Sequence, residues 1–171
     1  MKTKSIGKVY VFKVALDGNK RIWRRIAVRG NQTLDDLHEA IFKAFDREEE
    51  HLYSFFLPQP GSTRRLRDWE GIEYTHPYNC EANPIFDFFD QTPKHNAAKT
   101  KIDRLGLEVG QKFRCLFDFG DSWWHDIKVE QTDGEVEKGR YPRIIAKHGD
   151  SPPQYPDWDE DDEDDEDEDS D

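Results

Sequence analysis

The sequence has few cysteines, no long apolar run and a low hydrophobic content. Cys80 and Cys115 are too few for the disulfide framework of a small secreted domain, and neither lies in a Cys-x-x-Cys pair. No stretch of about 20 apolar residues is present, so no membrane span is expected. The first residues also lack the apolar core and the cleavage site of a signal peptide. These absences predict a protein of the reducing cytoplasm.

The negative charge is concentrated at one end of the chain. Of the 171 residues, 37 are acidic and 25 are basic, which gives a net charge of −12. Thirteen carboxylates lie in the segment 157–171, which has no Lys or Arg, and the rest of the chain carries 24 acidic and 25 basic residues. A segment of this composition cannot bury apolar surface. We therefore predict one domain over residues 1–156 and a disordered acidic tail over residues 157–171.

Apolar periodicity in the first third of the chain predicts a hairpin followed by a helix. Apolar residues alternate over 8–16 and 21–28, and Asp17-Gly18 between them is a strong hairpin-turn signal. Thr33 is a typical N-cap, and an apolar stripe follows it up to Phe45. This order of elements favours an α+β fold with an antiparallel or mixed sheet, for which a β-grasp-like arrangement is one candidate.

The rest of the chain contributes further strands. Residues 51–57 predict a third strand, and residues 62–100 are irregular. Residues 112–119 and 123–130 predict a C-terminal hairpin rich in aromatic side chains, with a turn between them and another turn at 132–134. Residues 136–145 predict a final ragged edge strand. The sheet is therefore expected to end in this aromatic hairpin.

One short segment gathers side chains that are common in functional sites. Two carboxylates, two indoles and an imidazole lie within nine residues: Phe117-Asp118-Phe119-Gly120-Asp121-Ser122-Trp123-Trp124-His125. In one interpretation, Asp118 and Asp121 approach His125 across the hairpin and orient a general base or bind a metal. In the other, the carboxylates cap a tight turn and the indoles pack on the core.

A second candidate surface combines an indole with arginines. Trp23, Arg24 and Arg25 are adjacent, and together with Arg64, Arg65 and Arg67 they predict a basic, aromatic surface for phosphate or for nucleic-acid bases. The alternative is a Trp side chain packed beneath arginine stems on a strand. Without its tail the chain is nearly neutral, which is not typical of a DNA-binding protein.

Three histidines form a third candidate group. His38, His51 and His125 lie on a predicted helix, a strand and a hairpin, and their spacing matches no metal motif such as His-Glu-x-x-His. Convergence of His51, His125, Asp118 and Asp121 on one metal would predict a metal-dependent hydrolase. His38, at the edge of an apolar stripe, is more typical of a residue at the margin of the core.

No complete catalytic constellation is present in the sequence. It contains no nucleophile motif, Walker loop or dinucleotide-binding fingerprint, so neither catalysis nor a cofactor is predicted. Our first hypothesis is a non-enzymatic binding module for protein or nucleic acid, with Trp23, Arg24, Arg25 and the 118–125 turn as its surface. The alternatives are the hydrolase and an adaptor whose acidic tail recruits a basic partner.

Three stretches together resemble the plasmid pRiA4b ORF-3-like family over about residues 8–153. They are Ile22-Trp23-Arg24-Arg25 followed by Thr33-Leu34-Asp35-Asp36-Leu37-His38, then His51-Leu52-Tyr53-Ser54-Phe55, then Phe117-Asp118-Phe119-Gly120-Asp121-Ser122-Trp123-Trp124-His125-Asp126-Ile127. The resemblance implies an α+β domain that occurs in many bacterial and archaeal proteins. Members have been associated with resolvases and transposition, so it also implies an association with mobile elements.

The chain departs from the pattern of this family at two places. The family usually has Gly-Trp before the His-Leu strand, where this chain has Asp46-Arg47-Glu48. Near the end, members often have a cysteine before Pro-Pro-Glu-Asp, where this chain has Ser151-Pro152-Pro153-Gln154. A function that needs that cysteine or that carboxylate is not expected in this chain.

Overall fold

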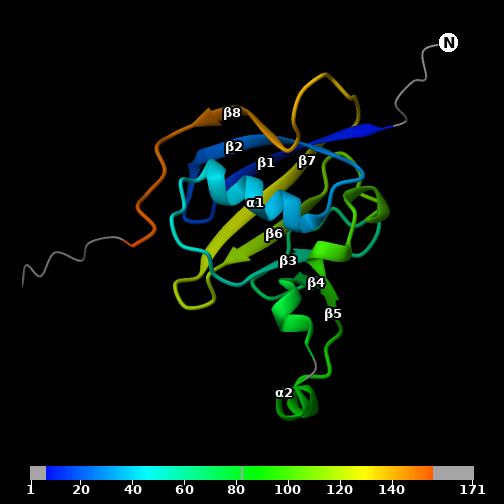
Figure 1. Ribbon diagram of the computed structural model, residues 1–171, viewed down its shortest axis with the longest axis vertical. Coiled ribbons are helices and arrows are strands. Elements are labelled where there is room, and N and C mark those ends of the chain that lie inside the picture. Colours follow the sequence, from blue (N-terminus) through cyan, green and yellow to red (C-terminus); the bar gives the residue numbers. More distant parts are fainter. Residues whose placement is uncertain (1–6, 82, 156–171) are drawn as a thin grey trace, which may run out of the picture.

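The computed structural model describes residues 7–81 and 83–155 (Figure 1). Residues 157–171, predicted to be a disordered acidic tail, lie outside the described residues. The elements are β1 (Lys8–Leu16), β2 (Asn19–Arg29), α1 (Leu34–Ala44), β3 (Tyr53–Leu57), β4 (Ile72–Thr75), α2 (Pro84–Phe89), β5 (Lys94–Asn96), β6 (Lys112–Phe117), β7 (Trp123–Glu135) and β8 (Arg143–His148), with 3₁₀ turns at Pro77–Cys80, Ala97–Lys99 and Ile102–Arg104.

The strands form one eight-stranded sheet in the order β5-β4-β3-β6-β7-β1-β2-β8. All neighbours pair antiparallel except β4 and β5, which are parallel, so the sheet is mixed. In Figure 1, α1 lies across one face of this sheet. A β-grasp-like arrangement is not confirmed, because the sheet extends well beyond the first hairpin and α1. No helix among the described residues is long and apolar enough to cross a membrane.

The first hairpin and the helix form as the local sequence signals predict. Leu16 lies opposite Asn19, and Gly18 takes φ +81° in the turn between them, a conformation that favours glycine. The Thr33 side chain caps α1 by accepting a hydrogen bond from the Asp36 N–H, and the Asp36 carboxylate accepts one from the Thr33 N–H. This reciprocal pair is a capping box.

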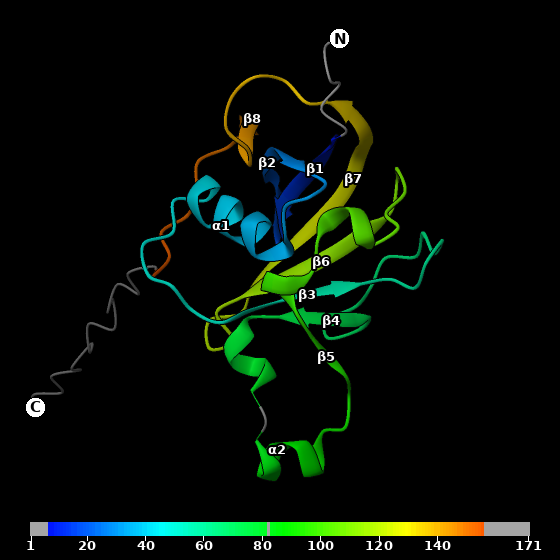
Figure 2. The ribbon, with the colours of Figure 1, turned by 45° about the vertical axis from the view of Figure 1, so that its right-hand side comes forward.

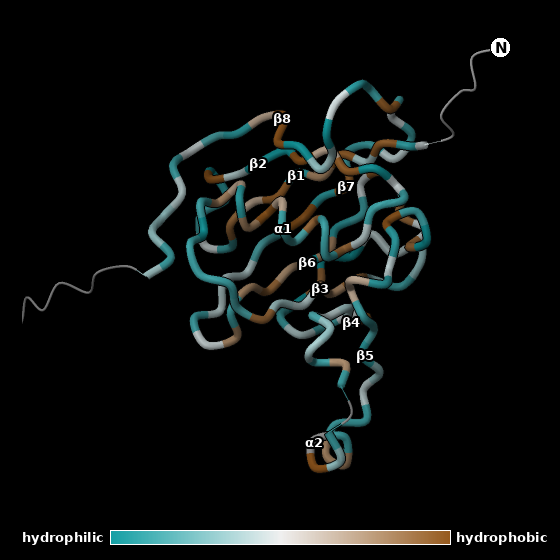
Figure 3. The backbone as a smooth tube through the Cα atoms, viewed as in Figure 1, coloured by the Kyte–Doolittle hydropathy of each residue, from teal (hydrophilic) through white to brown (hydrophobic). Residues whose placement is uncertain are grey.

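The main core lies between α1 and one face of the sheet. Because side chains alternate across a strand, every second residue of the central strands enters this core. Figure 3 shows hydrophobic colour along these strands and along parts of α1. Its fully buried members include Phe12, Val14, Ile26, Val28, Leu34, Leu37, Phe45, Tyr53, Phe55, Ile102, Cys115 and Val129.

The region 62–100 has more structure than the sequence predicted. It contains β4, β5 and the short helix α2, which stands away from the sheet in both ribbon views (Figures 1 and 2). α2 exposes Ile85, Phe88 and Phe89. The turn predicted at 132–134 is also absent, because β7 continues to Glu135 and pairs with β1 there.

Arg24 is buried in the core rather than exposed beside Trp23 and Arg25. The residue is 2% exposed, and its guanidinium donates hydrogen bonds to the carbonyl oxygens of Ala44 (2.8 Å) and His148 (3.0 Å). The prediction that all three residues share one surface is therefore wrong, because alternation along β2 turns Arg24 towards α1. Arg24 instead joins the end of α1 to the edge strand β8.

His125 is also buried. Its ring is fully inaccessible, lies 5.2 Å from the Phe45 ring, and has Nδ1 at 3.4 Å from the Cys115 carbonyl oxygen. Burial, and secondarily the positive charge of Arg47, lower the pKa of His125 to about 3. The imidazole is therefore neutral at physiological pH.

Replacement of Arg24 by Met should destabilise the domain by about 3 kcal/mol, because buried carbonyl oxygens would lose their donors. Arg25 forms a partly exposed ion pair with Glu130 at 3.0 Å. Arg25→Met is the matched control and should cost less than about 1 kcal/mol. Urea unfolding of the two variants measures both values, and equal losses would contradict the structural role of Arg24.

The stability of the domain should fall as pH decreases from about 6.5 towards about 3. In this window the unfolded chain protonates His125 whereas the folded chain does not, so stability falls by up to about 1.4 kcal/mol per pH unit. Urea unfolding at several pH values should show a shallower decline for His125→Gln than for the wild type. His148→Gln, at an exposed histidine, should retain the wild-type slope, and a wild-type slope for His125→Gln would contradict the prediction.

Candidate ligand-binding site at the hairpin ends

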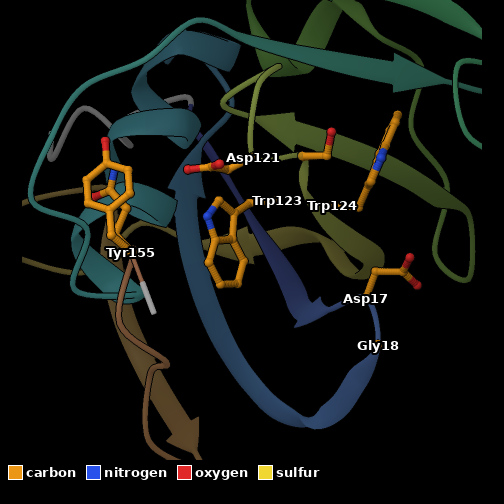
Figure 4. Close-up of a pocket in the computed structure, with 8 residues that line it drawn as sticks. Asp17, Gly18, Asp121, Trp123, Trp124 and Tyr155 are labelled. Carbon is orange, nitrogen blue, oxygen red and sulfur yellow. The ribbon is translucent and has the colours of Figure 1, made fainter. Parts of the chain in front are cut away.

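A pocket of about 540 Å³ lies where the ends of two hairpins meet the C-terminal segment of the described chain (Figure 4). The Asp17 N–H donates to the Trp124 carbonyl oxygen at 2.9 Å and so ties the β1–β2 turn to the start of β7. The lining residues are Asp17, Gly18, Asp121, Ser122, Trp123, Trp124, Gln154 and Tyr155. Asp121, Trp123 and Trp124 belong to the segment that the sequence singled out.

The turn between β6 and β7 is held by Asp118. Asp118 and Ser122 both have positive φ, +60° and +56°. One carboxylate oxygen of Asp118 accepts hydrogen bonds from the backbone N–H groups of Gly120 (3.0 Å) and Asp121 (3.3 Å). This is the turn-capping role that was one of the two interpretations of the segment. By shaping the turn, Asp118 positions Asp121 and Trp123 at the pocket.

The two indoles of this segment have different environments. Trp124 is 9% exposed and packs against Phe56 in a small cluster on the sheet face away from α1. Trp123 is only partly buried, and in Figure 4 its ring stands between Tyr155 on one side and Trp124 on the other. Its Nε1 is a buried atom without a hydrogen-bond partner among the described residues. Of the two indoles that line the pocket, Trp123 is therefore the more accessible to a ligand.

Arg47 packs against Trp123, and sequence reasoning missed it. Its guanidinium carbon lies 4.0 Å from the centroid of the Trp123 ring, a cation–π contact. The side chain is buried, and its three nitrogens have no hydrogen-bond partner among the described residues. Burial lowers the pKa of Arg47 to about 10, so the group stays charged at neutral pH. The only signal in the sequence was its place within the first departure from the family pattern.

The segment Ser151–Tyr155 closes one side of the pocket by binding to the loop 46–51. The Ser151 hydroxyl donates to the Asp46 carboxylate at 2.8 Å. The Gln154 amide oxygen accepts from the backbone N–H groups of Glu48 (2.7 Å) and Glu49 (3.1 Å). The two departures from the family pattern therefore contact each other in space.

The Tyr155 side of the pocket is acidic. The Tyr155 hydroxyl donates to Glu49 at 2.9 Å and lies 2.6 Å from His51 Nε2. Partial desolvation, followed by the hydrogen bond to Glu49 and the charges of Glu49, Asp118 and Asp121, raises the pKa of Tyr155. No Lys or Arg occurs among the described lining residues, and Asp121 has no ion pair among the described residues. The charge of Asp121 is therefore not neutralised by an ion pair within the described residues.

The opposite side of the pocket differs in charge. There the Asp17 carboxylate is paired with Arg65 at 3.4 Å and with Arg114 at 3.2 Å. These contacts neutralise Asp17. Asp121 is therefore the lining carboxylate that can form an ion pair with a ligand. A cation in the pocket would therefore be stabilised most strongly between Asp121 and Tyr155.

Two of the predicted histidines line a second pocket, of about 480 Å³. His38 is buried, stacks on Tyr53 with 3.8 Å between ring centroids, and has Nε2 at 3.3 Å from Glu50. Its hydrogen bond with Glu50 lowers the pKa of that carboxyl group. His51 and His76 also line this pocket. His38 thus occupies the core margin, as one interpretation expected.

The four metal candidates are not brought together. His51 Nε2 lies 3.6 Å from Asp118, but His125 is enclosed in the core beside Phe45. Within residues 7–81 and 83–155, no three His, Cys, Asp or Glu side chains are placed to hold one metal ion. The structure therefore gives no geometric support to the metal-dependent hydrolase.

Only some of the residues predicted to form a basic surface lie on the same face of the sheet. Trp23 and Arg25 lie on the sheet face away from α1, and the Arg25 guanidinium carbon is 4.8 Å from the Trp23 ring centroid. Arg65 pairs with Asp126 at 3.1 Å on the same face, whereas Arg64 pairs with Glu70 at 3.2 Å in the loop that follows β3. Much of the arginine charge is therefore neutralised within the protein.

Comparison with known proteins identifies relatives but gives no activity. The family model for the plasmid pRiA4b ORF-3-like protein matches residues 8–156. An uncharacterised protein, y4hQ of Sinorhizobium fredii, is 28% identical over 151 residues, which are 87% of this chain and 66% of that protein, slightly less than two thirds of its length. The crystal structure of MM3350, a protein of unknown function from Methanosarcina mazei Go1, is similar with a TM-score of 0.68 and 27% identity, and the match covers 89% of this chain and 76% of that one. The chain therefore belongs to the plasmid pRiA4b ORF-3-like family.

Proposed function

We propose that the chain is a non-enzymatic binding module that takes a Lys or Arg side chain of a partner protein into the pocket at the hairpin ends. The observation that carries this proposal is the lining of that pocket. It combines a partly open indole, Trp123, with an unpaired carboxylate, Asp121, and a phenol, Tyr155, at its acidic side. Concave sites with aromatic walls and a few placed polar groups are the usual form of a ligand site.

The chemistry of these walls favours a cation. Ring faces attract Lys and Arg with about 0.5–2 kcal/mol, depending on desolvation. Asp121 adds a charge-assisted hydrogen-bond acceptor beside the ring. Arg47 shows that the Trp123 indole already accepts one guanidinium within this protein, at 4.0 Å from its centroid. A cation of the partner would contact Trp123 on the pocket side, where Asp121 and the Glu49 carboxylate bound to Tyr155 supply negative charge.

The acidic segment supports a basic partner as well. Residues 157–171 contain thirteen carboxylates and follow Tyr155 closely in the sequence. Tyr155, the last described residue before them, lies on the acidic side of the pocket. Long-range attraction by these charges would speed the encounter with a basic partner, and the pocket would supply the specific contact. The binding module and the adaptor, separate hypotheses at first, thus become one function.

Variants of the pocket should weaken binding of a basic peptide. Fluorescence anisotropy of a labelled octalysine peptide at low salt measures the affinity. Asp121→Asn and Trp123→Leu should each weaken binding about fivefold, because each removes roughly 1 kcal/mol of contact with a bound cation. Asp121 is exposed, so its replacement tests the contact without disturbing the core.

Asp133→Asn is the matched control, since it removes one exposed carboxylate on β7 that does not line the pocket. It should bind the peptide as the wild type does. A further full-length variant has the carboxylates of residues 157–171 replaced by amides. It separates attraction of the peptide by the acidic tail from its binding in the pocket. Wild-type affinity in both pocket variants, with binding lost only in the amide chain, would show that the tail alone binds the peptide and would refute the pocket.

A further inference from the structure

Four cationic side chains form a row across the sheet face that α1 does not cover. In the observed register, Lys112 lies opposite Lys128, Lys128 opposite Lys13, and Lys13 opposite Arg25. The row crosses β6, β7, β1 and β2. Because neighbouring strands lie about 4.8 Å apart, it is roughly 14 Å long.

The three lysines of this row are not neutralised by the protein. Arg25 pairs with Glu130 at 3.0 Å, but Lys13, Lys112 and Lys128 take part in none of the ion pairs of the described residues. Like charges directly opposite each other on adjacent strands destabilise a sheet. These strands are central, so the lysines do not serve to protect a sheet edge. A stable fold that keeps such a row points to an anionic ligand.

A shallow cavity of about 190 Å³ lies along the same face. The loop residues Arg65 and Leu66 form one of its walls. One carboxylate, that of Asp126, occurs among its described lining residues, and it is already bound to Arg114 at 3.0 Å and to Arg65 at 3.1 Å. The cationic lining residues are Lys13, Lys20, Arg65, Lys112, Arg114 and Lys128.

We infer that this face binds the phosphate backbone of a nucleic acid. A row of roughly 14 Å is longer than one phosphate group needs, which favours a polymer over a single phosphate. Trp23, at the end of the row, is engaged by Lys13 and Arg25, each 4.8 Å from its ring centroid. Contacts with phosphate therefore dominate, and such contacts carry no base preference. The inference is independent of the pocket at the hairpin ends.

The test is the binding of a labelled 20-nucleotide oligo-dT to the full-length chain at several salt concentrations. The triple variant Lys13→Gln, Lys112→Gln, Lys128→Gln should bind at least about tenfold more weakly at low salt, and its slope of log K against log salt should fall by about 2. Without ligand this variant should also melt at a higher temperature than the wild type, because like-charge repulsion is removed.

The matched control is Lys43→Gln, Lys99→Gln, Lys138→Gln, which makes the same change in net charge at exposed positions outside the row. It should bind the oligonucleotide as the wild type does. If it binds as weakly as the row variant, net charge rather than the row sets the affinity and the inference is overturned. Displacement by inorganic tripolyphosphate at equal phosphate concentration would overturn a nucleic-acid polymer as the ligand.

The acidic tail is able to compete for the same lysines, so the titration includes the full-length chain whose residues 157–171 carry amides. Absence of binding in both this chain and the wild type would overturn the inference. Asp121→Asn, which tests the pocket, should leave oligonucleotide binding unchanged. The proposal for the pocket and the proposal for the cationic row can therefore be refuted independently.

Discussion

Period-two alternation in the central strands is the constraint on which both candidate surfaces depend. α1 covers one face of the sheet, so every second residue of these strands is buried and the residues between them must face away. In β2 the alternation buries Arg24 and leaves Arg25 on the open face; in β7 it buries His125 and exposes Lys128. A slip of one residue in β7 would bury lysine and expose Val129, so the register that forms the core also fixes the charge of the open face.

The two surfaces meet at Asp17. Its backbone N–H bonds the start of β7, and its side chain lines the pocket at the hairpin ends. The same carboxylate pairs with Arg65 and Arg114, both of which line the cationic cavity on the open face. Asp17 therefore separates an acidic region around Tyr155 from the basic row.

Sequence reasoning succeeded where the signals are local. The hairpin at Asp17-Gly18 and the helix cap at Thr33 depend on a few adjacent residues, and both form as expected. The pocket was not predictable, because Asp17 and Asp121 are brought together by contacts between β1 and β7 more than a hundred residues apart, and Tyr155 is placed by hydrogen bonds to the loop 46–51. The lysine row was equally hidden, since its members come from three strands and their alignment depends on the register.

The contact between the loop 46–51 and the segment 151–155 joins the two places where the sequence departs from the expected family pattern. Ser151 bonds Asp46, and Gln154 bonds the backbone at Glu48, so each side of the contact is held by the other. Arg47 belongs to the same contact and places its charge against Trp123. Because these residues form or support one wall of the pocket, the shape and charge of that wall depend on this contact as well as on the turn at Asp118.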